Sequence, residues 1–103
     1  GNYETDEKLN HARKLFLSEP KSLDNMRSAC EALSYILEPL RDDLALYFGS
    51  TDVSDFFQIV NRFDIRHNKE STIKLVEPEQ LEWIFYSLLN TINTYYKLKQ
   101  KGK

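Results

Sequence analysis

The segment from Arg62 to Lys74 concentrates side chains that can bind a phosphate group or transfer a proton. It holds four basic and two acidic residues, and His67 adds a charge that changes near neutral pH. Arginines stabilise negative charge that develops on a phosphate, and a neighbouring histidine can act as a general acid or base. Arg62 and His67 are therefore the candidate catalytic residues, and the candidate binding residues beside them are Arg66, Asn68 and Lys69.

This set of residues suits the cleavage of RNA by attack of its own 2′-hydroxyl, without a metal ion. That reaction needs a base for the hydroxyl, an acid for the leaving oxygen and cations around the phosphate. A structural interpretation is also open. Arg62 would then cap helix carbonyls, Arg66 would pair with a carboxylate of Glu70, Glu77 or Glu79, and His67 would bind the backbone. The residue types alone leave both interpretations standing.

The other residue types that often carry chemistry fit a scaffold. Cys30 and Met26 fall on an apolar helical seam, so we expect both in the core. His11 has no second metal-type residue at helical spacing, which predicts a surface or half-buried histidine. The chain has no glycine-rich phosphate loop, CxxC or HExxH motif, and we expect neither a cofactor nor a metal.

The elements that must position these residues are predicted to be helices. Glycine and proline number three each, and this scarcity favours an all-α bundle of four or five helices. A first helix should be capped by Thr5 or Asp6 and end before Pro20, because the proline ring blocks helical continuation. Its core face should comprise Leu9, Ala12, Leu15 and Phe16.

A strict heptad seam predicts a long second helix, from about 22 to 48. Ser22 suits its N-cap and Gly49 its end. The pattern runs through Pro39 without a change of phase, which favours a continuous helix kinked there. The alternative is two stacked helices with a joint near Glu38 and Pro39. The seam comprises Leu23, Met26, Cys30, Leu33, Leu37, Leu40, Leu44 and Tyr47.

Two further helices complete the expected bundle. A short one follows the turn at 50–52 and leads into the Arg62 segment, and a long one spans about 78–100, with Pro78 in its first turn. The last helix has a wide apolar stripe, so it should pack on more than one side. Three aromatic residues lie off that stripe and predict either extra core or a homodimer surface: Trp83, Tyr86 and Tyr96.

Composition sets the remaining limits. The 103 residues fit one helical domain, 1–103. The net charge of −2 gives no general basic field, so any contact with RNA must be local. The chain has no apolar run of about 18 residues, so we expect no membrane-spanning helix. Its single cysteine fits a reducing, cytoplasmic compartment. Because it begins at Gly1 rather than Met, we expect either the C-terminal part of a longer protein, with a preceding domain as partner, or a full chain with a tag remnant.

The layout resembles the HEPN superfamily, and most closely the HEPN-like domains at the C-terminal ends of phage abortive-infection proteins. The residues that carry the resemblance are Met26–Leu33, Phe63–Asn68 and the aromatic helix Leu81–Tyr96. The resemblance covers most of the chain, and its motif-like element is an Arg followed, after four to six residues, by His. Arg62 and His67 have that spacing, although Phe63 stands where the usual pattern has a polar residue.

This resemblance implies a four- to five-helix bundle, often dimeric, with the Arg-His elements facing each other across the two-fold axis. It also implies metal-independent endoribonuclease activity in active members, or RNA binding in degenerate ones, within a defence or toxin system. Arg62 and His67 would be the catalytic pair. The alternative function is a non-catalytic dimerisation or interaction domain of a larger protein.

Overall fold

The computed structural model describes residues 3–62 and 77–102, and every element in these two stretches is helical. The expected all-α bundle is therefore confirmed for this part of the chain. In chain order the elements are α1 (Tyr3–Leu17), α2 (Leu23–Leu37), the 3-10 turn η1 (Glu38–Leu40), α3 (Arg41–Phe48), α4 (Ser50–Arg62) and α5 (Pro78–Gly102).

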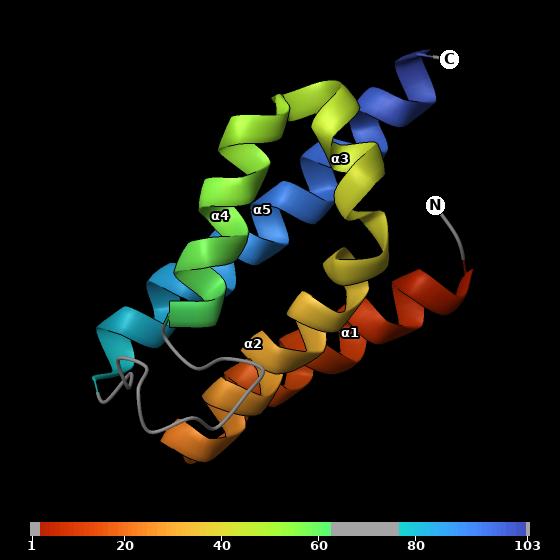
Figure 1. The fold of residues 1–103 in the computed structure, drawn as a ribbon. Coiled ribbons are helices and arrows are strands. Elements are labelled where there is room, and N and C mark those ends of the chain that lie inside the picture. The colour runs from red at the N-terminus through yellow and green to blue at the C-terminus, as the bar shows by residue number, and fades with distance from the viewer. Residues whose placement is uncertain (1–2, 63–76, 103) are drawn as a thin grey trace.

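The helices form two groups that meet along α5. Helices α1 and α2 run antiparallel beside each other, and α5 packs along α2 (Figure 1). Helices α3 and α4 form a hairpin, and α3 also contacts α5. None of the described helices, α5 included, has the sustained apolar length that a membrane crossing requires.

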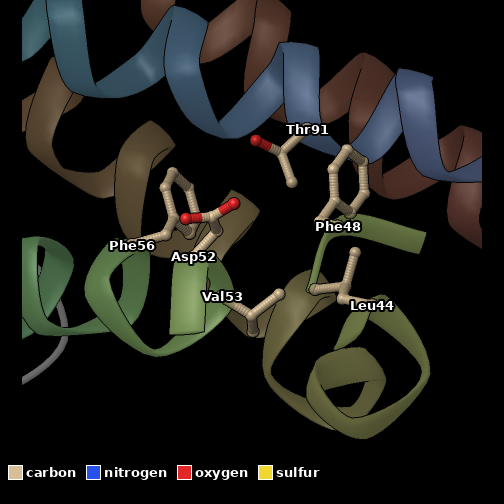
Figure 2. Close-up of a pocket in the computed structure, with 6 residues that line it drawn as sticks. All are labelled: Leu44, Phe48, Asp52, Val53, Phe56 and Thr91. Atoms are coloured by element: carbon tan, nitrogen blue, oxygen red, sulfur yellow. The ribbon is translucent and has the colours of Figure 1, made fainter. Parts of the chain in front are cut away.

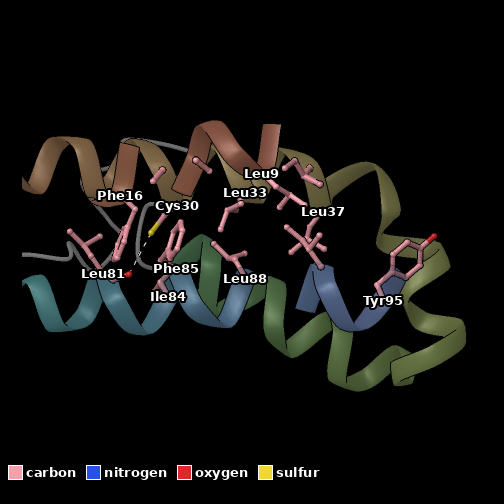
Figure 3. Close-up of a cluster of buried hydrophobic side chains, with 14 of the residues drawn as sticks. Leu9, Phe16, Cys30, Leu33, Leu37, Leu81, Ile84, Phe85, Leu88 and Tyr95 are labelled. Carbon is pink, nitrogen blue, oxygen red and sulfur yellow. Dashed lines mark hydrogen bonds between the residues drawn. The ribbon is translucent and has the colours of Figure 1, made fainter. Parts of the chain in front are cut away.

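The core lies where the apolar faces of α1, α2 and α5 meet (Figure 3). Phe16 of α1 stacks on Phe85 of α5, with ring centroids 4.0 Å apart and planes 7° from parallel. This contact ties α1 to α5 as well as to α2. The largest fully buried side chains are Tyr95, Phe16, Phe57, Phe85, Met26, Leu33, Leu37, Leu44, Leu81, Ile84, Leu88 and Ile92.

The predicted long helix over 22–48 is divided in the structure into α2 and α3, joined by the 3-10 turn at Glu38–Leu40. This matches the alternative with a joint near Glu38 and Pro39 rather than one continuous helix. Proline has no backbone N–H and its ring clashes with the preceding turn, so regular α-helical hydrogen bonding is interrupted there. Leu37 and Leu44 stay buried on either side of the joint, whereas Leu23 and Tyr47, at the ends of the seam, are exposed.

Several helix ends follow the predicted signals. The Ser22 hydroxyl accepts a hydrogen bond from the backbone N–H of Asn25 at 3.0 Å, as expected of an N-cap. Gly49 follows α3 with a φ of 86°, a conformation that favours glycine, and Pro78 is the first residue of α5. Helix α1 differs, because it begins at Tyr3, before the expected caps Thr5 and Asp6.

Candidate functional site

The outward side of α5 carries aromatic and charged side chains along its length. Its opposite side enters the core through residues such as Leu81, Phe85, Leu88 and Ile92. At about 100° per residue, the outward residues fall within roughly 60° of one line along the helix. We name this exposed line the α5 face, and it consists of Glu79, Glu82, Trp83, Tyr86, Asn90, Lys97 and Lys101.

The aromatic part of the α5 face combines exposure with order. Trp83 is 53% exposed and Tyr86, about one turn further on, is 51% exposed. The Tyr86 ring makes edge contacts with Phe85 at 5.2 Å and with Phe16 at 5.7 Å between centroids, so core rings hold one side of it. The two aromatic side chains line a shallow hollow on the surface together with Glu79, Glu82, Ser87 and Asn90. Ordered aromatic surface of this kind is typical of protein interfaces.

Charge along the α5 face is divided by sign. Glu79 and Glu82 lie near the start of the helix, and Lys97 and Lys101 lie near its end. Both placements complement the helix dipole, since the N-terminal end is partly positive and the C-terminal end partly negative. The face therefore presents an acidic, aromatic half and a basic half.

A second cluster joins α3 to α5 through Asp43, Tyr95 and Lys99. The Tyr95 phenol donates a hydrogen bond to the Asp43 carboxylate, and the Lys99 ammonium donates one to the phenol oxygen at 3.3 Å. The Lys99 nitrogen also lies 3.8 Å from an Asp43 carboxylate oxygen. Burial, followed by the hydrogen bond to Asp43, raises the pKa of Tyr95, so the phenol keeps its proton at neutral pH. The cluster therefore stabilises the contact between α3 and α5, and its phenol does not serve as a general base.

A small pocket lies between α3, α4 and α5 (Figure 2). Its volume is about 180 Å³, below the range of roughly 300–1,000 Å³ that small-molecule sites usually have. The Thr91 hydroxyl at its wall donates a hydrogen bond to the carbonyl of Ser87 at 2.8 Å. The pocket is too small to enclose a nucleotide. Its lining is Leu44, Phe48, Asp52, Val53, Phe56 and Thr91.

Cys30 and Met26 are core residues, as the seam predicted. Cys30 is fully buried, and its thiol donates a hydrogen bond to the carbonyl of Leu81 at 3.6 Å (Figure 3). Burial raises the pKa of the thiol to about 12, against a smaller lowering by Arg27. A thiol that stays protonated and enclosed is a poor nucleophile and a poor metal ligand.

His11 is exposed on α1, in agreement with its predicted surface position. It borders a groove between α1 and α2 that Glu4, Glu7 and Tyr35 also line. Over residues 3–62 and 77–102, no three His, Cys, Asp or Glu side chains come together in a way that could hold a metal ion.

The predicted Arg-His site falls largely outside the described part of the structure. Arg62 is the last residue of α4. The side chain of Arg62 lies outside what the structure describes, as do the other predicted site residues: Arg66, His67, Asn68 and Lys69. Their interpretation still rests on the sequence.

Sequence reasoning missed the Asp43, Tyr95 and Lys99 cluster, because Asp43 and Tyr95 are 52 positions apart. The four-residue step from Tyr95 to Lys99 was the only local signal, and such steps are common on helices. No family model matches the chain, and neither the curated proteins nor the solved structures searched gave a match.

Proposed function

We propose that this chain is a non-catalytic interaction module that associates through the α5 face. The observation that carries the proposal is that Trp83 and Tyr86 are both about half exposed, on the side of α5 opposite the core. Tryptophan and tyrosine are enriched among the residues that dominate binding energy at interfaces. Since core rings already order Tyr86, a partner gains contact area at a low entropic cost.

The state of the reactive groups in the described structure supports a non-catalytic role. The Cys30 thiol is enclosed, and the Tyr95 phenol is engaged with Asp43 and Lys99. A module of this kind would bring copies of the chain together, or join it to a preceding domain of a longer protein. A homodimer is the form that we propose.

The single tryptophan makes the proposal directly testable. On association, Trp83 fluorescence should shift to shorter wavelength as protein concentration rises, with a matching rise in mass by light scattering. Trp83→Lys should weaken association at least roughly tenfold, the effect expected when a central aromatic contact worth about 1.4 kcal/mol or more is lost. Leu46→Lys is the matched control, because Leu46 is 78% exposed on α3, away from the α5 face.

The mass of a monomer at every concentration would contradict the proposal, and so would equal weakening by Trp83→Lys and Leu46→Lys. Circular dichroism of each variant checks that the helices are retained. Leu46→Lys guards against a general effect of added positive charge, because both substitutions add one lysine.

A second proposal follows the resemblance to HEPN-like domains: RNA targeting in a defence or toxin system, by metal-independent cleavage or by binding alone. Its support is the sequence concentration of Arg62, Arg66, His67, Asn68 and Lys69. In this proposal His67 is the acid or base, Arg62 stabilises charge on the phosphate, and the other three residues bind phosphate.

Incubation with single-stranded RNA in the presence of a chelator tests this second proposal. The unmodified protein should cut the RNA, and His67→Ala should abolish cutting while the helical content is unchanged. His11→Ala is the matched control, since His11 is exposed on α1 and is not a proposed site residue. RNA that stays intact with and without metal excludes cleavage, whereas retained binding that Arg66→Ala removes would favour the binding-only form.

A further inference from the structure

We infer that the partner of the α5 face is the α5 face of a second copy, aligned antiparallel, with the two-fold axis beside Asn90. The inference rests on the proposed interaction function and specifies its geometry. Asn90 lies in the middle of the face and is exposed. An axis beside it brings each residue of α5 opposite the residue that lies equally far on the other side of position 90.

The charges of the α5 face fit this alignment. Glu79 and Lys101 are equally far from Asn90, so the alignment brings the carboxylate of one copy to the ammonium of the other. Trp83 and Lys97 are likewise equidistant, so the ammonium comes opposite the exposed part of the Trp83 side chain. Each contact occurs twice in a two-fold dimer, because an isologous interface repeats every pair.

The opposite alignment is unfavourable for the same reason. Parallel helices in register would place Glu79 and Glu82 against their own copies, and Lys97 against Lys97. Like charges in contact oppose association, and parallel helix dipoles repel. The division of charge along α5 therefore selects the antiparallel arrangement.

The rest of the described structure leaves room for this pairing. Helices α1 and α2 pack on the core side of α5 through residues such as Phe85 and Leu88, and α3 contacts Tyr95. The start of α1 borders Lys97 at one edge of the α5 face, and the Lys97 side chain is exposed there. The 25 residues of α5 span about 37 Å at 1.5 Å per residue. The proposed contact is a single helix pair with charged ends, so we expect a weak dimer that salt weakens further.

Cysteine cross-linking tests the alignment directly. Cys30 is fully buried, so an introduced surface cysteine is the main reactive thiol. An equimolar mixture of Glu79→Cys and Lys101→Cys proteins should form a disulfide-linked dimer on mild oxidation, and Asn90→Cys should do so alone. Glu79→Cys alone should not, because the two copies of position 79 would lie about 33 Å apart along the helices. Asp24→Cys, exposed at the start of α2, is the control for random collision.

Charge exchange gives a second and independent measurement. The double variant Glu79→Lys, Glu82→Lys should raise the dissociation constant of its own dimer at least tenfold, and so should Lys97→Glu, Lys101→Glu. A variant that carries all four substitutions should restore association with itself to within about threefold of the unmodified protein, and it should not pair with the unmodified protein. This combination requires that opposite ends of α5 meet, because a parallel pairing would instead favour the mixed dimer, in which opposite charges lie in register.

The outcomes separate failure of the alignment from failure of the proposed function. Efficient cross-linking of Glu79→Cys with itself overturns the antiparallel alignment and leaves association through the α5 face in place. A dimer that Trp83→Lys disrupts, but that shows neither cross-linking at position 90 nor charge exchange, also overturns the inference alone. A chain that is monomeric at every concentration, with no cross-link above the Asp24→Cys control, overturns both.

Discussion

The phenol of Tyr95 on α5 donates a hydrogen bond to the carboxylate of Asp43 on α3, joining two helices whose residues lie 52 positions apart. Lys99, one turn further along α5, donates a hydrogen bond to the same phenol oxygen at 3.3 Å. Only Gly49 separates α3 from α4. The contact between Tyr95 and Asp43 therefore helps to hold the whole α3–α4 hairpin against α5.

Removal of this hydrogen bond should destabilise the fold measurably. We expect Tyr95→Phe to lower the free energy of unfolding by about 1–2 kcal/mol, because it keeps the buried ring and removes the donor to Asp43. Urea unfolding followed by circular dichroism gives the measurement. Tyr86→Phe is the control, since it removes the hydroxyl of a half-exposed ring, and it should cost less than about 0.5 kcal/mol. Equal effects of the two substitutions would contradict the role given to the phenol of Tyr95.

The same cluster predicts a loss of stability at alkaline pH. The pKa of Tyr95 is raised above its usual 10.0 in the folded protein, chiefly by burial, so the folded state holds the phenol proton more tightly than the unfolded state. The stabilisation that the Tyr95 phenol gives to the folded state is complete below about pH 10. It is lost as the pH rises through the pKa that Tyr95 has in the folded protein. The pKa of Lys99 is also raised, chiefly by its hydrogen bond to Tyr95, and this acts in the same direction above pH 10.5.

Urea unfolding between about pH 8 and 11 measures this dependence, with Tyr95→Phe as the reference. The stability difference between the unmodified protein and Tyr95→Phe should be constant near neutral pH and shrink above about pH 10. A difference that grows with pH would mean that the folded state favours the phenolate, contrary to the burial of Tyr95.

The core contact between α1 and α5 gives a prediction with a neighbouring control. Phe16 is fully buried and stacks on Phe85, whereas Leu17 is 57% exposed. Phe16→Ala should cost about 3–5 kcal/mol through lost burial and a cavity, and Leu17→Ala less than about 1 kcal/mol. Thermal and urea unfolding measure both. If Phe16→Ala unfolds the chain outright, Phe16→Leu supplies a measurable intermediate, and a cost equal to that of Leu17→Ala would contradict the packing.

Apolar spacing predicted much of the fold because it reports directly which face of a helix is buried. Leu9, Ala12 and Phe16 of α1 lie in the core, where the pattern placed them. The same pattern favoured continuity through Pro39, and the structure has a 3-10 turn there. A heptad pattern records which side chains face inward, and a joint that keeps Leu37 and Leu44 inward leaves the pattern unchanged.

The site was less predictable, for two different reasons. The partners Tyr95 and Asp43 meet only because the hairpin folds back on α5, and no local sequence spacing records that contact. Trp83 and Tyr86 were recognised as lying off the apolar stripe, but two options remained open, extra core or an exposed surface. Their exposure in the structure selects the surface, whereas Tyr96 is partly buried against the core. The predictions for Arg66 and His67 lie outside the described residues and stay predictions.

Gly49 provides a test of backbone geometry that is separate from packing. It follows α3 with a φ of 86° and a ψ of 139°, and its N–H donates a hydrogen bond to the carbonyl of Ala45 at 3.1 Å. A side chain at this φ is strained, so Gly49→Ala should lower the free energy of unfolding by about 1–3 kcal/mol. The nearest atom to an added Cβ is a carboxylate oxygen of Asp52 at 3.9 Å, which is an ordinary contact.

The strain at Gly49 can therefore be distinguished from steric crowding. Because the surrounding space is open, Gly49→Ala and Gly49→Leu should cost nearly the same, whereas crowding would make the larger residue worse. Thr51→Ala, at an exposed position in the first turn of α4, is the control and should change stability by less than about 0.5 kcal/mol. Urea unfolding of the three variants distinguishes backbone strain from steric crowding at Gly49. A neutral Gly49→Ala would mean that the chain between α3 and α4 adopts a negative φ at little cost, and the hairpin geometry described here would be wrong at that residue.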